Sequence, residues 1–315
     1  MRLSYAITAF RCVAGRSALA WLLVAAASVA RPAGPLLAQS GGGVRPGESD
    51  TSSVISQDTL NLELDSAEVS PPPECGWIGT GPWAERPTVN WAFGVAETLY
   101  YDIGWQSIVA AHGVMYVNEP VDTNGRLCYP IYSVVNSTPF LSTFFRVDDS
   151  AVTFMDVHEL FPLRFEKYLR EGKYRSDRIA DFDPVAGLAY TPADTLVVPP
   201  YVQDPLSLLY HVRSLDLQPG TDLLVENYDG KKVYTLTVRI LRRERVEVKA
   251  GVFSTIVVEP LLQAAGLFKH EGRLTVWLTD DRLHLPVLMK SKVIVGSIVA
   301  ELSQYNLGQI RRFRK

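Results

Sequence analysis

The stretch best suited to chemistry is 276–290, VWLTDDRLHLPVLMK, in which two adjacent carboxylates precede a histidine. Asp280 and Asp281 are followed three residues later by His284, and acids beside a histidine occur in metal sites and in acid–base catalysis. The flanking residues favour another interpretation. Apolar residues alternate on both sides of the acids, as in two strands, and aspartate stabilises turns by accepting bonds from nearby backbone N–H groups. We therefore predict a hairpin, with His284 facing outward.

Other candidate metal ligands and nucleophiles are weaker. The remaining histidines have no ligand spacing; they are His112, His158, His211 and His270. The segment DVHELF lacks the second histidine that a zinc-binding helix needs. No serine lies in a G-x-S-x-G elbow, and the glycine-rich SGGGVRPG follows no expected strand. The sequence therefore predicts no metal, no cofactor and no catalytic residue.

Several carboxylates could still meet in a cleft, as glycoside hydrolysis requires. These are Asp148 with Asp149, Asp181 with Asp183, and Asp216. Each also fits a turn or a helix cap. A hydrolase with an unrecognised carboxylate pair therefore remains an alternative to a non-enzymatic function.

Apolar and aromatic side chains offer a different kind of site. The segment 93–105, FGVAETLYYDIGW, alternates with period two and carries large apolar residues on one face, interrupted by Glu97. A similar face follows Asp229-Gly230. The candidate lining residues of an apolar cavity are Leu99, Tyr101, Ile103, Trp105, Tyr234, Leu236, Val238 and Ile240. The same residues could instead fill an ordinary core.

The chain before this region predicts export. Arg2, Arg11 and Arg16 precede an uncharged run at 17–30, and small residues offer cleavage after Ala30 or Ala38. A helix of that run would span about 21 Å, short of the roughly 30 Å hydrocarbon core. We therefore predict a signal peptide at 1–38, no transmembrane segment in the mature chain, and a location in the periplasm or cell envelope.

The rest divides into a tether, a domain and a tail. Residues 39–73 are rich in Gly, Ser and Pro and hold six acids against one arginine, which predicts a disordered acidic tether. A single β-rich domain is expected at 74–307, and a basic tail at 308–315. The formal net charge of −3 gives no basic face for nucleic acid.

Two cysteines remain after cleavage of the signal peptide. Cys75 and Cys128 predict one disulfide, because exported chains commonly pair their cysteines. Two unpaired thiols are the alternative. Cys12 precedes the apolar run and Cys75 lies far beyond it, so no N-terminal lipidation is predicted.

The elements expected within the domain are nine to eleven antiparallel strands. Hairpins are predicted at Glu171-Gly172-Lys173, at Asp183-Pro184, at Asp229-Gly230 as a two-residue type I′ turn, and at Ala250-Gly251. The C-terminal part of the domain, residues 273–305, has the pattern of three consecutive strands. Pro130 inside LCYPIYSVV indicates a sheet edge or a bulge.

Two short helices complete the prediction. Asp204 with Pro205 starts one that ends at Pro219-Gly220, and Ser137 or Thr138 caps the other ahead of Pro139. We expect a mainly β fold with one strongly curved antiparallel sheet, a half-barrel or open barrel, whose concave face the helices fill.

Residues 90–305 resemble the bacterial family called domain of unknown function 3108, a group of exported envelope proteins. The resemblance rests on the Asp-Pro-Leu-Ser helix start at 204–207, the Ala-Gly-x-Phe turn at 250–253 and the Asp-x-x-x-x-Pro hairpin at 281–286. The family has no established activity, so no catalytic residue is implied.

That family is in turn similar to periplasmic lipoprotein carriers and lipid-binding half-barrel lipoproteins. The similarity implies an acyl chain held inside the curved sheet, although fold-level analogy does not establish function. We therefore expect a non-enzymatic envelope protein that binds a lipid or another apolar ligand. An envelope scaffold that binds a protein partner through a sheet edge or the acidic tether is the first alternative.

Overall fold

The computed structural model of the chain describes residues 88–105, 108–261, 273–292 and 297–313. The predicted signal peptide, the predicted tether and residues 74–87 lie outside the described residues. Within them, one 15-stranded antiparallel sheet and two short helices account for the regular structure. The mainly β prediction is confirmed, with more strands than expected.

Hydrogen bonding places the strands in the order β10-β11-β12-β13-β14-β15-β1-β2-β4-β5-β6-β7-β8-β9, with β3 paired to β4. The strands are β1 (Thr98–Trp105), β2 (Ile108–Val117), β3 (Val121–Thr123), β4 (Arg126–Ser137), β5 (Asp148–Asp156), β6 (Pro162–Glu171), β7 (Tyr174–Asp183), β8 (Leu188–Tyr190), β9 (Thr195–Val197), β10 (Asp222–Tyr228), β11 (Val233–Val248), β12 (Gly251–Leu261), β13 (Leu274–Thr279), β14 (Pro286–Lys292) and β15 (Ser297–Asn306). No pairing between β9 and β10 closes the described sheet into a barrel.

Two details of the predicted β10–β11 region are wrong. The turn has four residues rather than two, because Tyr228 pairs with Val233 and the Asp229 side chain accepts bonds from Lys231 N and Lys232 N. The sequence pattern also predicts RERVEV as a strand of its own, and this is wrong. The segment continues β11, whose register shifts by a bulge between Ile240 and Arg242.

Pro130 lies within the sheet and not at an edge. Its carbonyl accepts a bond from Asn118 N, so its missing N–H points to the same side of β4. On that side β2 pairs from Ile131 onward and β3 pairs up to Cys128. Pro130 therefore falls in the gap between two partner strands, where no ladder bond is lost.

The strand predicted to begin at Phe93 begins at Thr98. Ala96 has φ of 66°, and a Cβ on Gly94 would lie 2.2 Å from the Gln309 carbonyl oxygen, so the chain kinks here against its own C-terminal segment. Gln309 pairs with Val95 in this kink. Glu97, the one polar residue of the predicted apolar face, is buried beside this kink.

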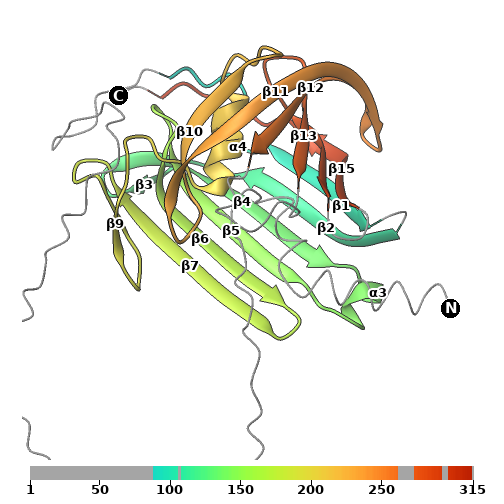
Figure 1. Cartoon of the computed structure of the whole chain (residues 1–315), viewed down its shortest axis with the longest axis horizontal. Coiled ribbons are helices and arrows are strands. Elements are labelled where there is room, and N and C mark those ends of the chain that lie inside the picture. The colour runs from blue at the N-terminus through green and yellow to red at the C-terminus, as the bar shows by residue number, and fades with distance from the viewer. Residues whose placement is uncertain (1–87, 106–107, 262–272, 293–296, 314–315) are drawn as a thin grey trace, which may run out of the picture. The chain divides into compact units, whose positions relative to one another are not determined.

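The sheet curves strongly around its own concave face (Figure 1). Register shifts interrupt the pairings of β1 with β2 and β15, β5 with β6, β11 with β12, and β13 with β14. Each such bulge increases the local twist and bends the strand. The prediction of a curved, open sheet is confirmed, and its curvature has this local cause.

The two helices are short and their N-terminal caps are as predicted, but the second helix ends at Arg213 and not at Pro219-Gly220. In α3 (Pro139–Ser142), Thr138 accepts a bond from Leu141 N, while in α4 (Pro205–Arg213), Asp204 caps a helix with proline at its first position. Figure 1 shows α4 inside the curve, between β10–β11 and β4–β5, and α3 at the far end of β4. Only α4 is a plug.

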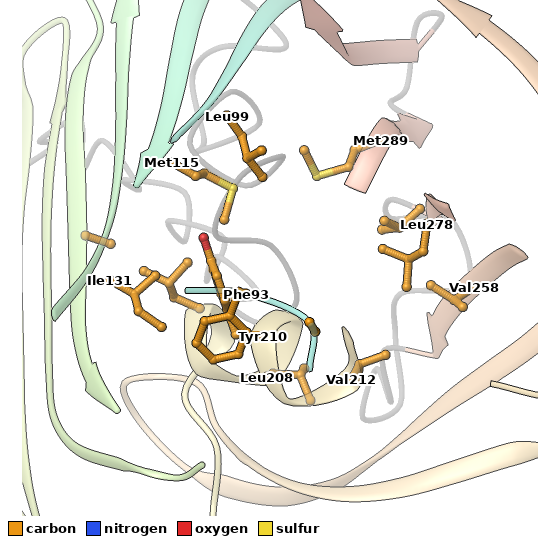
Figure 2. Close-up of a cluster of buried hydrophobic side chains, with 14 of the residues drawn as sticks. Phe93, Leu99, Met115, Ile131, Leu208, Tyr210, Val212, Val258, Leu278 and Met289 are labelled. Atoms are coloured by element: carbon orange, nitrogen blue, oxygen red, sulfur yellow. The ribbon is translucent and has the colours of Figure 1, made fainter. Parts of the chain in front are cut away.

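The main hydrophobic core lies where α4 meets the concave face. Figure 2 shows Leu208, Tyr210 and Val212 of α4 among side chains from strands on both sides of the curve. These include Leu99, Met115 and Ile131 from one side and Val258, Leu278 and Met289 from the other. Both halves of the sheet therefore share one core, which stabilises the curvature.

The two ends of the sheet approach each other without pairing edge to edge. Tyr228, at the end of β10, contacts Phe182 of β7 edge to face, with ring centroids 5.6 Å apart. A Cβ on Gly230 in the following turn would lie 4.0 Å from the Arg178 Cβ of β7. The β10–β11 hairpin thus folds against β7.

Candidate functional site on the concave face

Asp281 organises a turn, as predicted. Its Oδ1 accepts bonds from Leu283 N at 2.9 Å, His284 N at 3.2 Å and the Thr279 hydroxyl at 2.7 Å. Asp280 points elsewhere and accepts a bond from Arg243 Nε at 3.0 Å. The two acids therefore diverge, which excludes a joint carboxylate site between them.

His284 does not face outward, contrary to the prediction. It has φ of 42°, which turns its ring toward the end of α4. Its Nδ1 lies 2.7 Å from the Arg213 carbonyl oxygen and donates to it, since a carbonyl only accepts. His284 therefore satisfies a free carbonyl at the helix C-terminus.

Arg213, the last residue of α4, makes a buried ion pair with Glu97. Its NH1 and NH2 lie 2.8 Å from the two oxygens of Glu97, and both side chains are almost fully buried. Arg213 NH2 also donates to Ala92 O at 2.9 Å, and Nε donates to Leu283 O at 3.2 Å. One guanidinium therefore joins α4, the segment before β1 and the β13–β14 turn.

Aromatic rings surround this ion pair. The Arg213 guanidinium lies 4.8 Å from the Tyr210 ring centroid and 5.7 Å from that of Phe93. Burial opposes the charge of Arg213, but Glu97 outweighs it, so the pKa of Arg213 stays above its ordinary value. The Tyr101 hydroxyl donates to Pro286 O at 2.7 Å beside the pair. These contacts fix the C-terminal end of α4 against the neighbouring segments.

The other end of α4 is held by a second buried group. Asp204 accepts bonds from Leu206 N and Ser207 N, and its other oxygen accepts from the Thr153 hydroxyl of β5 at 2.6 Å. Burial raises the pKa of Asp204 to about 6, against the lowering effect of the Thr153 bond. Thus α4 crosses the concave face from β5 to the β13–β14 turn.

An apolar band runs along the concave face from α4 toward α3, and its members Leu99 and Met115 also pack in the core at α4. Its members are buried and come from β1, β2, β4 and β15; they are Leu99, Tyr101, Ile103, Ala111, Met115, Val135 and Ala300. Cross-strand pairing keeps them contiguous, with Leu99 opposite Met115 and Ile103 opposite both Ala111 and Ala300.

The predicted lining residues divide between this band and the core near α4. Leu99, Tyr101 and Ile103 belong to the band, while Leu236, Val238 and Ile240 of β11 are buried in the same hydrophobic cluster. Tyr234 is half-buried and its hydroxyl accepts a bond from Asn227 Nδ2 at 3.1 Å. The side chain of Trp105 lies outside the described residues. Whether any of them lines a cavity stays a prediction.

A polar cluster adjoins the apolar band on the same face. It consists of Ser133 on β4, Asp149 on β5, and Lys167 and Glu171 on β6, each at least nine-tenths buried. Ser133 and Lys167 both pair with Ala151, and Asp149 pairs with Val135 of the band. Paired residues point to the same side of a sheet, so these side chains face inward.

Burial shifts the pKa values of the acidic and basic groups in the polar cluster. Burial raises the pKa of Asp149 to about 6, although the Arg170 N–H, at 2.7 Å from Oδ1, lowers it, as do Lys167 and Glu171. Burial likewise lowers the pKa of Lys167 to about 8, against the raising effect of Asp149, Glu171 and Asp229. Shifts of this kind gather at functional sites.

The sequence analysis missed the polar cluster apart from Asp149. Phe165, Lys167, Leu169 and Glu171 share one face of β6, and a lysine between two apolar residues was the available signal. The dense charges of LRFEKYLREGKYRSDRIADF instead predict that at least one face of this hairpin is exposed to solvent. That inference is correct for the other face, where Arg164 bridges Glu166 and Asp181.

The other candidate carboxylates serve the surface and its turns. Asp148 is exposed and accepts a bond from Asn136, Asp183 caps the turn that follows β7, and Asp216 accepts from Gln218. Asp181 is held by Arg164. Of the acids named from the sequence as pair candidates, Asp149 alone enters the concave face.

The remaining histidines lie apart. His112 is on the convex face and bonds to Asp102 at 2.8 Å, His158 is half-buried, His211 is buried in α4, and His270 lies outside the described residues. Within the described ranges no three His, Cys, Asp or Glu side chains are grouped to hold a metal ion.

Cys128 is a buried thiol in a small second cluster with Phe161 and Leu163. Its Sγ donates to Arg126 O at 3.6 Å, and burial raises its pKa to about 12. Cys75 lies outside the described residues, so the disulfide between the two stays a prediction.

No helix in the described part of the chain has both the length and the apolar character needed to cross a bilayer. Comparison with curated proteins finds no match. Among solved structures, the chain is similar to a beta-barrel-like protein of the family DUF1849 from Brucella abortus, at 12% identity and a TM-score of 0.46, over 69% of this chain and 99% of that one.

Two further solved structures are more distant. A candidate lipoprotein from Parabacteroides distasonis is 10% identical, with a TM-score of 0.34 over 70% of this chain and all of that one. A candidate exported protein with a YmcC-like fold from Bacteroides fragilis is also 10% identical, with a TM-score of 0.26 over 70% of this chain and 99% of that one.

The decisive match is to a family model of unknown function. It covers residues 100–303, from β1 to β15, and so includes the polar cluster, the α4 helix and the apolar band except Leu99. The sequence resemblance is thereby confirmed, and the chain belongs to the protein family of unknown function DUF3108.

Proposed function

We propose that the protein is an exported, non-enzymatic carrier that binds an apolar or amphipathic ligand of the cell envelope along the apolar band. The observation that carries this proposal is the position of the band. It continues the core at α4 along the concave face. A contiguous apolar surface of this kind is chemically suited to an apolar occupant.

Physical chemistry favours an acyl chain as that occupant. Burial of apolar surface contributes about 25 cal/mol per Å², and no directional group is needed to hold a hydrocarbon. Small-molecule sites are mostly apolar with a few polar groups placed for orientation. The band supplies the first feature through residues such as Leu99, Ile103 and Met115, and the adjacent polar cluster supplies the second.

The N-terminal sequence supports the location. Residues 1–38 have the basic, apolar and small-residue order of a signal peptide, and an exported protein meets lipids in the envelope. The absence of recognisable catalytic motifs in the sequence is the ground for proposing a carrier in place of a hydrolase.

Native mass spectrometry of the protein purified after export from a bacterial host tests the proposal. We expect adducts of lipid mass that organic extraction removes and that thin-layer or mass analysis identifies. Purified protein that carries no lipid and binds no fluorescent fatty acid would contradict the proposal.

A matched pair of substitutions locates the ligand. Ala111→Trp fills the band between Ile103 and Ser137, whereas Val114→Trp places the same side chain on the opposite face of β2. We expect Ala111→Trp to lower bound lipid at least fivefold and Val114→Trp to leave it unchanged, with folding of both checked by circular dichroism. Equal lipid in both variants would place the ligand elsewhere.

Deletion of residues 39–73 distinguishes the carrier from an envelope scaffold. A carrier retains its lipid without this segment, because the band lies wholly within the sheet. A scaffold that acts through the acidic segment would lose a protein partner on deletion, which affinity pull-down measures.

A further inference from the structure

Two aromatic side chains are exposed to solvent at the α3 end of the sheet. Phe140 of α3 is 58% exposed and Phe144, just after the helix, is 42% exposed. Their rings contact each other edge to face, with centroids 5.7 Å apart, whereas Leu141 between them is buried. The short helix therefore anchors itself through Leu141 and presents the two phenyl rings outward.

The start of β2 extends this exposed apolar group. Ile108 and Val109 are both exposed, and the next residue, Ala110, accepts bonds through its carbonyl from the N–H and the hydroxyl of Thr138, the N-cap of α3. Single exposed apolar residues are ordinary, but a group gathered from two neighbouring segments is typical of a surface that binds an apolar partner.

Basic side chains lie next to the apolar group. Arg146 follows the exposed rings in the chain, and Lys173 and Arg175 lie at the β6–β7 turn. The two segments touch, because Gly172 N donates to Arg146 O at 2.7 Å. Asp148 lies 3.4 Å from Arg146 in a pair that is open to solvent. We call the apolar group and these three cations the end surface.

The cations of the turn are not neutralised by neighbouring acids. Lys173 and Arg175 are exposed, and neither forms an ion pair with a carboxylate in the described part of the chain. The nearest acid along β7, Asp177, is held by Arg170. The whole chain carries a formal net charge of −3, so this positive group runs against the overall charge balance.

The end surface adjoins the apolar band. Ala111 of the band pairs with Ser137, whose hydroxyl lies 2.7 Å from the Ser142 hydroxyl of α3. Figure 1 shows α3, the adjoining ends of β1 and β2, and the β6–β7 turn along one end of the sheet. A partner bound to the end surface would therefore meet the band where the band ends.

We propose that the end surface docks on an anionic lipid bilayer, with Phe140 and Phe144 among the acyl chains and the cations beside the lipid phosphates. The inference rests on the proposed carrier function, because it names the surface from which the band is loaded. Apolar side chains that enter the bilayer and basic groups that attract anionic headgroups together anchor peripheral proteins. A bilayer is favoured over an acidic protein because the adjoining band suits acyl chains.

Co-sedimentation with vesicles tests the docking. The exported protein is mixed with vesicles of equal parts phosphatidylglycerol and phosphatidylcholine, and with vesicles of phosphatidylcholine alone. We expect at least tenfold tighter binding to the anionic vesicles. This binding should fall at least fivefold as the ionic strength rises from about 0.1 M to about 1 M, because the screening length shortens from about 10 Å to about 3 Å. Equal binding to both vesicles, or binding to neither, would overturn the proposal, as would an acidic protein partner in place of vesicles.

A charge reversal locates the basic part of the surface. Lys173→Glu with Arg175→Glu should lower the affinity for anionic vesicles at least tenfold. Lys231→Glu with Arg245→Glu is the matched control, because it reverses two exposed cations of the β10–β11 region and leaves the end surface intact. Circular dichroism checks that both variants fold. Equal losses in the two variants would mean that total charge and not the end surface governs binding.

Aromatic substitutions locate the apolar part. Phe140→Ser with Phe144→Ser should also lower vesicle binding at least tenfold, whereas Leu224→Ser, at a 72% exposed position of β10, should leave it unchanged. Vesicles with brominated acyl chains should quench the added fluorescence of Phe144→Trp at least threefold more than that of Leu224→Trp. Equal quenching of the two tryptophans would contradict insertion at the end surface.

A fatty-acid titration distinguishes failure of docking from failure of the carrier function. The variant Lys173→Glu with Arg175→Glu should bind a fluorescent fatty acid in solution with unchanged affinity but take up fluorescent lipid from anionic vesicles at least fivefold more slowly. Wild-type protein that binds the fatty acid and no vesicle would overturn docking alone. Protein that binds vesicles and no fatty acid would contradict the carrier function alone. Loss of fatty-acid affinity in this variant would overturn the assignment of these residues to docking.

Discussion

At the scale of single residues, the concave face contains charges that weaken the fold. Burial raises the pKa of Asp149 to about 6 in the folded protein, whereas an unfolded aspartate titrates near 3.9. The folded state therefore holds a proton that the unfolded state loses between about pH 4 and 6. Asp204, with its pKa also raised to about 6, acts in the same direction.

The sign of the resulting pH dependence follows. Stability falls as the pH rises from 4 to 6 and stays low above, because the folded state binds more protons in that window. Asp149→Asn removes the cost of a buried charge, so the free energy of unfolding at pH 7 should rise by up to about 3 kcal/mol. Urea denaturation at pH 4.5 and pH 7 measures both effects.

Asp148→Asn controls for a general effect of removing a negative charge. Its denaturation profile should run parallel to that of the wild type at both pH values. If Asp149→Asn destabilised the protein at pH 7, the hydrogen bonds of the Asp149 carboxylate, among them the one from Arg170 N, would outweigh the cost of burying its charge.

At the scale of elements, α4 depends on polar groups buried at its two ends. Asp204 fastens its start to Thr153, and Arg213 fastens its end to Glu97. A nine-residue helix is too short to be stable alone, so these contacts and its apolar face keep it in place. The sequence predicted this helix from Asp204 and Pro205, but Glu97 gave no signal except its place on an apolar face.

Substitution of Arg213 tests the importance of the helix end. Arg213→Met leaves the Glu97 carboxylate buried and unpaired, and removing one partner of a buried pair costs about 3–5 kcal/mol. The double variant Glu97→Leu with Arg213→Met should recover part of this loss, because no uncompensated charge remains. Chemical denaturation of the two single variants and the double variant gives the coupling energy.

An exposed ion pair provides the comparison for this cycle. Arg239 bonds to Asp222 at the surface, where solvent screens the charges, so Arg239→Met should hardly change the denaturation midpoint. Additive effects of the Glu97 and Arg213 substitutions would contradict a direct interaction between the two side chains.

At the scale of the whole domain, local patterns predicted the fold better than they predicted the site. Period-two alternation identified the strands, and Asp, Gly and Pro located most turns, because both signals act over a few residues. The polar cluster depends on β4, β5 and β6 lying in one register, with Ser133 and Lys167 both opposite Ala151. Register between strands is a property of the assembled sheet, so a single sequence does not reveal it.

The approach of the two sheet ends is likewise a property of the assembly, and it can be tested by a covalent link. A Cβ at position 230 would lie 4.0 Å from the Arg178 Cβ, within the range of about 3.5–4.5 Å that disulfides span. We expect the variant Arg178→Cys with Gly230→Cys to oxidise to a disulfide between β7 and the β10–β11 turn. The buried Cys128 thiol should not compete.

The link should also stabilise the domain. Closing a loop of about 50 residues restricts the unfolded chain by about 4 kcal/mol, less the strain of a side chain at position 230, where φ is 91°. Mass spectrometry after alkylation detects the bond, and denaturation with and without reductant measures its effect, with each single cysteine variant as the control. Free thiols after oxidation would mean that the hairpin does not rest against β7 and that the curved sheet opens between its ends in solution.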